Sequence, residues 1–75
     1  MSERSWDEHL AWCKERAFEY VDRGEIREGL TSMFSDVSKH ERGKNHPGIQ
    51  MGIGLMVIGA LSSPREARRF IEGFN

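Results

Sequence analysis

His9 and Cys13 are the two residues of this chain whose types and spacing come nearest to supporting chemistry. They are one helical turn apart, so a helix would place the imidazole beside the thiol, as two metal ligands or as a nucleophile with its base. The alternative is that Cys13 is simply a small buried hydrophobic residue on the core face. His40 and His46 lie far along the chain, and no second His/Cys pair has ligand spacing. We therefore expect no metal, no cofactor and no catalytic centre.

The serines and glycines also lack the context of catalytic or phosphate-binding motifs. No serine has G-x-S-x-G surroundings. Gly48, Gly52 and Gly54 fall inside an expected helix, whereas a phosphate loop precedes its helix. The sequence gives no support for an enzyme, and we expect the protein not to be one.

Three arginines near the end of the chain form the clearest cationic group. Arg65, Arg68 and Arg69 would share the polar face of one helix, where they could bind phosphate or acidic side chains. The alternative is a solvated face with Glu66 and Glu72 as helix-spaced partners. Three arginines and a net charge of −1 are too little for strong DNA affinity, so binding of nucleic acid is not expected.

Two aromatic residues do not fit the apolar face of the first expected helix. At about 100° per residue, Trp12 and Phe18 fall on opposite flanks of that face. Tryptophan is enriched at binding hot spots. We therefore take Trp12, Phe18 and the three arginines as candidate partner-binding residues. The face itself is formed by Trp6, Leu10, Cys13, Ala17, Tyr20 and Val21.

The periodicity and the capping signals predict an all-α bundle of four short helices, over residues 5–23, 25–40, 47–61 and 64–74. Capping boxes begin the first helix at Ser5 and the last at Ser63. Gly24 is suited to ending the first helix. The tight link predicts an antiparallel hairpin of the first two helices, with Gly29 allowing close approach near Ala17.

The segment from Pro47 to Leu61 is apolar on nearly every side and contains no charged residue. A helix of this kind is normally buried, so we expect the third helix to be central in the bundle. Its glycines Gly48, Gly52 and Gly59 would form a narrow stripe for close approach. The segment falls short of the roughly 20 residues that a membrane-spanning helix needs, so no membrane is expected.

Length and composition predict one helical domain over residues 1–75, near the size at which small domains often recruit a partner. Residues 1–30 carry five Lys/Arg and eight Asp/Glu, a balance of −3, and residues 31–75 carry six and four, a balance of +2. A single cysteine and an N-terminus without a signal-peptide pattern predict a cytoplasmic protein.

Several segments resemble small, uncharacterised helical proteins encoded by tailed bacteriophages. They are LAWCKERA at 10–17, SDVSKH at 35–40, HPGIQMG at 46–52 and RRFIEGFN at 68–75. This resemblance implies the cytoplasm of an infected bacterium and no mechanism. A weaker resemblance, carried by Ala17, Tyr20, Gly24 and Leu30, is to one tetratricopeptide hairpin; it supports the hairpin geometry only.

These observations lead to one expected function and two alternatives. We expect a non-enzymatic phage protein that acts by protein–protein interaction in the host, as a homodimer, because the apolar surface exceeds what short helices readily cover. Either the fold wraps the third helix completely or part of that helix is an interface. The alternatives are a nucleic-acid-binding regulator that uses Arg65, Arg68 and Arg69, and a minor virion or assembly component.

Overall fold

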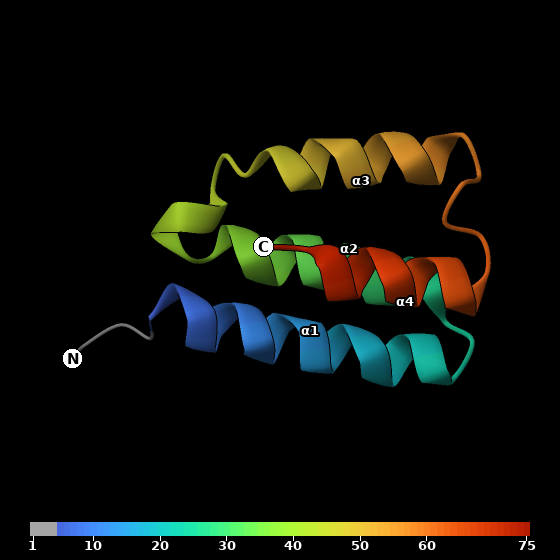
Figure 1. Ribbon diagram of the computed structural model, residues 1–75, viewed down its shortest axis with the longest axis horizontal. Helices are drawn as coiled ribbons and strands as arrows, with labels where there is room; N and C mark the ends of the chain where they lie inside the picture. Colours follow the sequence, from blue (N-terminus) through green and yellow to red (C-terminus); the bar gives the residue numbers. More distant parts are fainter. Residues whose placement is uncertain (1–4) are drawn as a thin grey trace.

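The computed structural model describes residues 5–75 and shows an all-α bundle (Figure 1). Its elements are α1 (Trp6–Asp22), α2 (Ile26–Ser38), the short 3₁₀ helix η1 (Glu41–Gly43), α3 (Pro47–Val57) and α4 (Pro64–Gly73). This confirms the fold class and the order of the four helices. The N-terminal segment used for the signal-peptide prediction includes residues 1–4, which lie outside the described residues.

Local signals set both ends of α1. The Ser5 side chain accepts a hydrogen bond from the Glu8 N–H, and the Glu8 side chain returns to the Ser5 N–H, which completes the predicted capping box. At the other end Gly24 has φ +84°, and its N–H donates to the Val21 carbonyl. A left-handed residue there closes the helix, as predicted.

The hairpin of α1 and α2 is held at close range by Gly29. A Cβ on Gly29 would lie 3.0 Å from the carbonyl oxygen of Ala17 and 3.0 Å from Cβ of Tyr20. Only a residue without a side chain fits there without displacing α1. The predicted contact between Gly29 and the Ala17 region is therefore confirmed.

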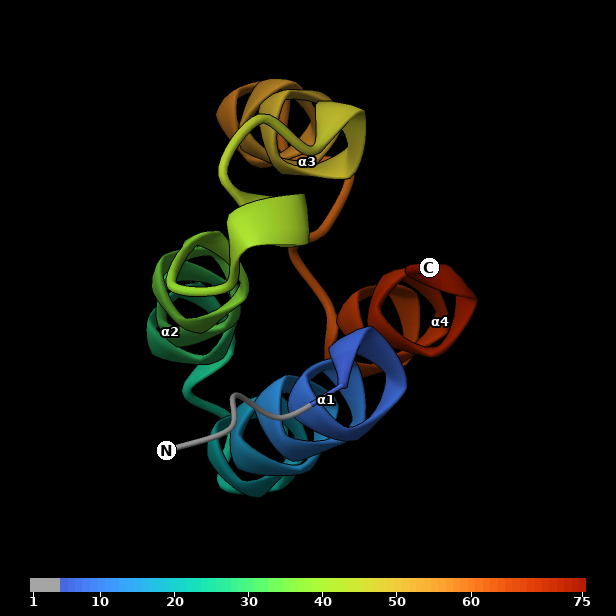
Figure 2. The ribbon, with the colours of Figure 1, turned by 90° about the vertical axis from the view of Figure 1, so that its left-hand side faces the viewer.

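The core is built by three helices, α1, α2 and α4. The last of these begins at Ser63, whose hydroxyl accepts from the Glu66 N–H, and it packs against α1. Figure 2 shows the four helices end on, with α3 on the opposite side of the bundle from α1. The buried hydrophobic residues are Trp6, Leu10, Cys13, Ala17, Val21, Leu30, Met33, Phe34, Val37, Leu61, Ala67, Ile71 and Phe74, and none of them belongs to α3.

The prediction that the third helix is central is therefore wrong. Gly52 is the one buried residue of α3, while Met51 and Val57 are 64% and 81% exposed. The physical reason is that α1, α2 and α4 each have one apolar and one polar face, and these directed faces close a core among themselves. An apolar helix without a polar face has no such direction, and it is left on the outside.

The third helix is also shorter than predicted and ends at Val57 instead of residue 61. Gly59 has φ +79°, and the Ala60 N–H donates to the Leu55 carbonyl, which is the hydrogen bond of a glycine-terminated helix. Gly59 is thus an end signal and not part of a packing stripe. Gly48 and Gly52 do allow close approach, to Phe74 and to Phe34.

Candidate functional site

Trp12, the first candidate residue for partner binding, is half-buried on the flank of α1. The guanidinium carbon of Arg16 lies 5.0 Å from the centre of its ring, and the His9 ring lies 5.8 Å away. Trp12 also packs against the hydrophobic core. Part of the surface expected for a partner is therefore covered by the chain itself.

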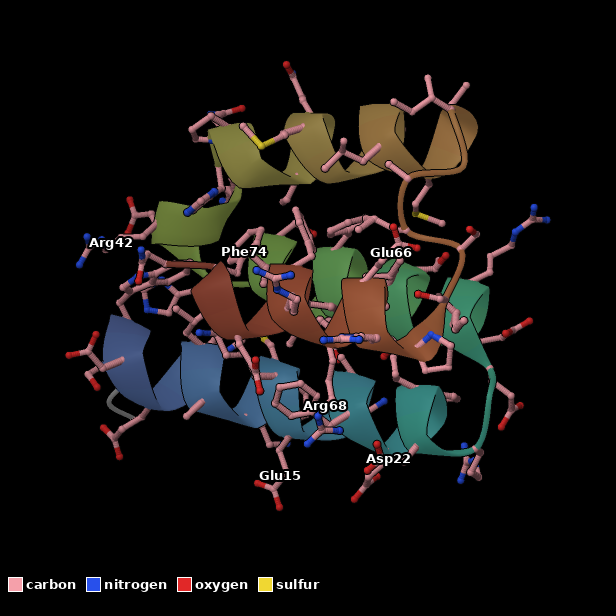
Figure 3. The ribbon with its side chains drawn as sticks, turned by 45° about the vertical axis from the view of Figure 1, so that its right-hand side comes forward. Glu15, Asp22, Arg42, Glu66, Arg68 and Phe74 are labelled. Carbon is pink, nitrogen blue, oxygen red and sulfur yellow. The ribbon has the colours of Figure 1, made fainter. Side chains whose placement is uncertain are left out.

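Phe18 and Arg68, two further candidates, are brought together by the fold. The guanidinium carbon of Arg68 lies 4.5 Å from the centre of the Phe18 ring, a cation–π contact. Its Nη1 atom is 2.6 Å from Oδ1 of Asp22. In Figure 3, Arg68 extends from α4 toward Asp22 on α1. These contacts dock α4 on α1, so Arg68 has a structural role.

The three arginines differ in their contacts within the chain. Arg65 and Arg69 are exposed on α4, and Arg69 borders a hollow between α3 and α4 together with Met51 and Phe70. Arg68 is engaged with Asp22 and points to α1. One of the three arginines of the expected cationic face is thus engaged in an ion pair within the chain.

A cluster of all three histidines around Trp6 is a feature that sequence reasoning missed. The Trp6 ring lies 5.4 Å from that of His40 and 5.8 Å from that of His46, and His9 lies 5.2 Å from His40. The sequence contains no signal for this, because Trp6 and His9 come from α1, whereas His40 and His46 come from the connection between α2 and α3. Arg42 caps the cluster, with its guanidinium carbon 5.5 Å from the Trp6 ring centre.

Two of these histidines form hydrogen bonds that connect separate segments of the backbone. The Nδ1 atom of His46 accepts from the Gly48 N–H at 2.9 Å and caps α3, while its Nε2–H donates to the Asn75 carbonyl at 2.7 Å. The Nε2–H of His9 donates to the Asp36 carbonyl at 2.6 Å. Within residues 5–75, no three His, Cys, Asp or Glu side chains are placed to hold a metal ion.

Asp36 is a buried carboxylate, 3% exposed, between α1 and α2. It pairs with Arg16 at 3.0 Å and with Lys39 at 3.1 Å. Next to it Cys13 is fully buried, and burial together with the charge of Asp36 raises the pKa of the Cys13 thiol to about 11. A thiol with so high a pKa is a poor nucleophile at neutral pH, so Cys13 is a core residue.

An open groove with a volume of about 840 Å³ lies between α2 and α3. Its apolar lining consists of Ile26, Phe34, Ile49, Ile53, Met56, Val57 and Leu61, and α2 adds the hydroxyls of Thr31, Ser35 and Ser38. Arg27, at the start of α2, and Lys44, beyond its end, complete the lining. Within residues 5–75 neither cation forms an ion pair.

The groove exists because α3 contacts its neighbours at few points. Gly52 lies directly on the ring of Phe34, and a Cβ there would also lie 2.8 Å from Cζ of Phe70. The two rings meet edge to face, 6.1 Å apart. Ile53 and Met56 lie on the side of this contact that faces α2, where they line the groove without filling it.

No family model, curated protein or solved structure matches the chain. No helix in the described part of the chain has the length and apolar character needed to cross a membrane. The candidate site is therefore defined by geometry and chemistry alone, as the apolar groove between α2 and α3 with a cation toward each end of α2.

Proposed function

We propose that this protein acts by binding another protein, and that the groove between α2 and α3 takes an amphipathic helix of the partner. The observation that carries the proposal is the composition of the groove, which combines apolar walls with Arg27 and Lys44. A partner helix in such a groove buries an apolar face at i, i+3, i+4 and i+7 spacing. Acidic side chains near its two ends would pair with the two unpaired cations.

The dimensions of the groove support a helix as the occupant. Arg27 and Lys44 bracket α2, whose 13 residues span about 20 Å at the usual rise of a helix. Two helices that pack side by side have axes about 8 to 10 Å apart. A partner helix of about the same length as α2 would reach both cations while it contacts Ile53 and Met56.

The biological setting follows from the resemblance to bacteriophage proteins. We place the protein in the cytoplasm of an infected bacterium, where it would modulate a host protein without catalysing a reaction. The groove would bind the partner helix, and Trp12, Phe18 and Arg69 remain candidates for an additional contact with the partner.

A peptide-display selection on the full chain tests the groove. The library presents amphipathic helices of 13 residues, the length of α2, with randomised charges at both ends. We expect enrichment of peptides that combine an apolar face with Asp or Glu near the ends. Selection on the double variant Arg27→Glu and Lys44→Glu should enrich Lys and Arg at the same positions.

Two controls make the result specific. Variant Glu15→Lys changes a charge on α1, on the far side of the bundle from the groove (Figure 3), and should leave the selected sequences unchanged. Variant Met56→Glu places a charge inside the groove and should abolish enrichment. The proposal fails if the selected peptides are indifferent to the Arg27→Glu and Lys44→Glu reversal or to Met56→Glu.

A further inference from the structure

Two histidines form the same kind of backbone cap at the two turns that lead into α3. His40 precedes η1, and its Nδ1 atom accepts a hydrogen bond from the Arg42 N–H at 3.1 Å. His46 precedes α3, and its Nδ1 atom accepts from the Gly48 N–H at 2.9 Å. In both turns the ring caps the N–H two residues further along the chain. The connection from α2 to α3 (Figure 1) therefore contains two imidazole caps in succession.

Each cap requires a ring whose Nδ1 atom carries no proton. A backbone N–H can only donate, so the nitrogen that faces it has to accept. The imidazolium form has a proton on both ring nitrogens, and it would direct N–H against N–H at Arg42 and at Gly48. Histidine is the side chain whose charge ordinarily changes between pH 5 and 8. Protonation in this range therefore removes both caps.

His9, the third histidine of the cluster at Trp6, is bonded in the opposite sense. Its Nε2–H donates to the Asp36 carbonyl at 2.6 Å, and an imidazolium ring makes the same bond. The Nε2–H of His46 also donates to the Asn75 carbonyl in either charge state. The effect of a proton is thus specific to the two Nδ1 acceptors, and His9 is a control within the same cluster.

The surroundings of the His46 ring provide no partner for an added positive charge. The ring stacks on Trp6 at 5.8 Å and on Phe74 at 4.5 Å, and within residues 5–75 it forms no ion pair. Two cations lie nearby, since Arg42 covers the Trp6 ring and Arg69 borders the same hollow as His46.

The other titratable or charged groups around the ring come from the neighbouring elements, because α3 itself has none. They are Asp7, Glu8 and His9 on α1, Asp36 and Lys39 on α2, His40 at the start of η1, Glu41 on η1, Lys44 in the link to α3, and Glu72 on α4. Asp36 is already paired with Arg16 and Lys39, and the other carboxylates are exposed.

The two caps also fix the position of the groove. Lys44, one of its two cations, lies between the cap at His40 and the cap at His46. The apolar wall on α3 includes Ile49 and Ile53, just beyond the second cap. Since α3 contributes no hydrophobic residue to the buried core, its attachment depends on few contacts, and the hydrogen bonds of His46 are among them.

We propose that a proton on the Nδ1 atom of His46 releases the start of α3 and thereby abolishes partner binding in the groove at mildly acidic pH, with His40 acting in the same sense on the preceding turn. This regulation rests on the proposed function, because it controls the same groove. The docked form of α3 excludes the proton, so docking weakens as the pH falls and is restored as the pH rises.

Amide hydrogen exchange of the full chain without any peptide tests the release of α3. Rates are measured at about pH 7.5 and about pH 5.5, on either side of the ordinary histidine range, and expressed as protection relative to the intrinsic rate at each pH. We expect the protection of Gly48 and Ile49 to fall at least about tenfold at the lower pH. Protection of Ala17 and Val21, in the core of α1, should stay within about twofold.

Two variants separate the cap from general effects of acid. Variant His46→Asn keeps a capping oxygen and does not titrate, so the difference in α3 protection between the two pH values should disappear. Variant His9→Gln removes a histidine from the same cluster and keeps a donor for the Asp36 carbonyl. It should leave the pH response of α3 unchanged.

A second measurement covers the case in which His46→Asn perturbs α3 by itself. The ¹⁵N chemical shifts of the imidazole rings in the parent chain report the protonation of each nitrogen. At neutral pH we expect Nδ1 of His46 to be unprotonated. It should gain a proton over the same pH interval in which α3 loses protection.

Binding of a peptide selected on the groove completes the test. The parent chain should bind it at least about tenfold more weakly at about pH 5.5, where Asp and Glu of the peptide are still largely ionised. His46→Asn should bind it equally at both pH values.

Each outcome decides for or against the proposal. Equal α3 protection at both pH values overturns it, as does a response that persists in His46→Asn, one that disappears in His9→Gln, or an equal loss of protection in α1. If α3 is released but the peptide binds equally at both pH values, the proposed function stands and the regulation fails. If no peptide is selected while α3 protection still follows His46, the proposed function fails and the release of α3 is supported.

Discussion

The Nε atom of Arg16 lies 3.0 Å from Oδ2 of Asp36, which joins the middle of α1 to the second half of α2. The same guanidinium covers the ring of Trp12 at 5.0 Å. One side chain thus compensates a buried carboxylate and shields an apolar ring. The interface between α1 and α2 depends on this contact as well as on the close approach at Gly29.

Replacing Arg16 with methionine should destabilise the fold. The apolar stem is kept, but Asp36 loses one of its two cations while it stays buried, so we expect the free energy of unfolding to fall by roughly 1 to 3 kcal/mol. Because Arg16 is partly exposed, the effect should lie below that for a fully buried pair. In an Asp36→Asn background the same replacement should have a smaller effect. Urea titrations of the double-mutant cycle measure this difference, and strictly additive losses would contradict it.

The buried thiol of Cys13 should make the fold sensitive to high pH. Burial, and next the negative charge of Asp36, raises the pKa of Cys13 from 9.0 to about 11. The unfolded chain releases this proton above about pH 9, whereas the folded chain keeps it until about pH 11. The stabilisation linked to the raised pKa of Cys13 is therefore complete below pH 9 and is lost as the pH rises through 11.

Unfolding of Cys13→Ala and of the parent chain, measured on both sides of this pH range, tests the expectation. The parent should lose roughly 2 to 3 kcal/mol more than the variant, since one pKa unit corresponds to about 1.4 kcal/mol. Comparing the two chains isolates the contribution of the Cys13 thiol, because the rest of the sequence is the same. Equal losses in the two proteins would show that the Cys13 pKa is not raised.

Two glycines of α3 should respond to alanine with opposite signs. At Gly54 a methyl group meets nothing within 4 Å, so Gly54→Ala should stabilise the protein by about 0.5 to 1 kcal/mol through helix propensity. At Gly52 the methyl group would overlap the ring of Phe34 and lie 2.8 Å from Cζ of Phe70. Overpacking costs about 1 to 3 kcal/mol, so Gly52→Ala should destabilise the protein.

Thermal unfolding distinguishes the two variants. Amide exchange within α3 should speed up in Gly52→Ala and slow down in Gly54→Ala. If both substitutions shifted stability in the same direction, the placement of α3 on Phe34 and Phe70 would be incorrect.

The ring of His46 should anchor the start of α3 to the C-terminal end of the chain. Variant His46→Ala removes both the cap on Gly48 and the bond to Asn75, so we expect a loss of about 1 to 2 kcal/mol. Variant His46→Asn keeps an effective cap and should recover part of that loss. Hydrogen exchange at Gly48 and Ile49 reports the cap directly, and unchanged protection in His46→Ala would count against it.

The sequence by itself determined the elements whose signals are local. Ser5 with Glu8, Ser63 with Glu66, and Gly24 mark helix ends through hydrogen bonds between residues a few positions apart, so their effect does not depend on the rest of the fold. The apolar periodicity of α1 likewise identified the face that turns inward, and Gly29 indicated where two helices come close.

Only the tertiary structure decided the position of α3 and everything that follows from it. An apolar segment without a polar face carries no information about direction, so its composition could not show that three other helices would complete the core without it. The histidine cluster at Trp6, the burial of Asp36 and the groove bounded by Arg27 and Lys44 each combine segments distant in sequence. Such features arise from packing, and no spacing within one helix encodes them.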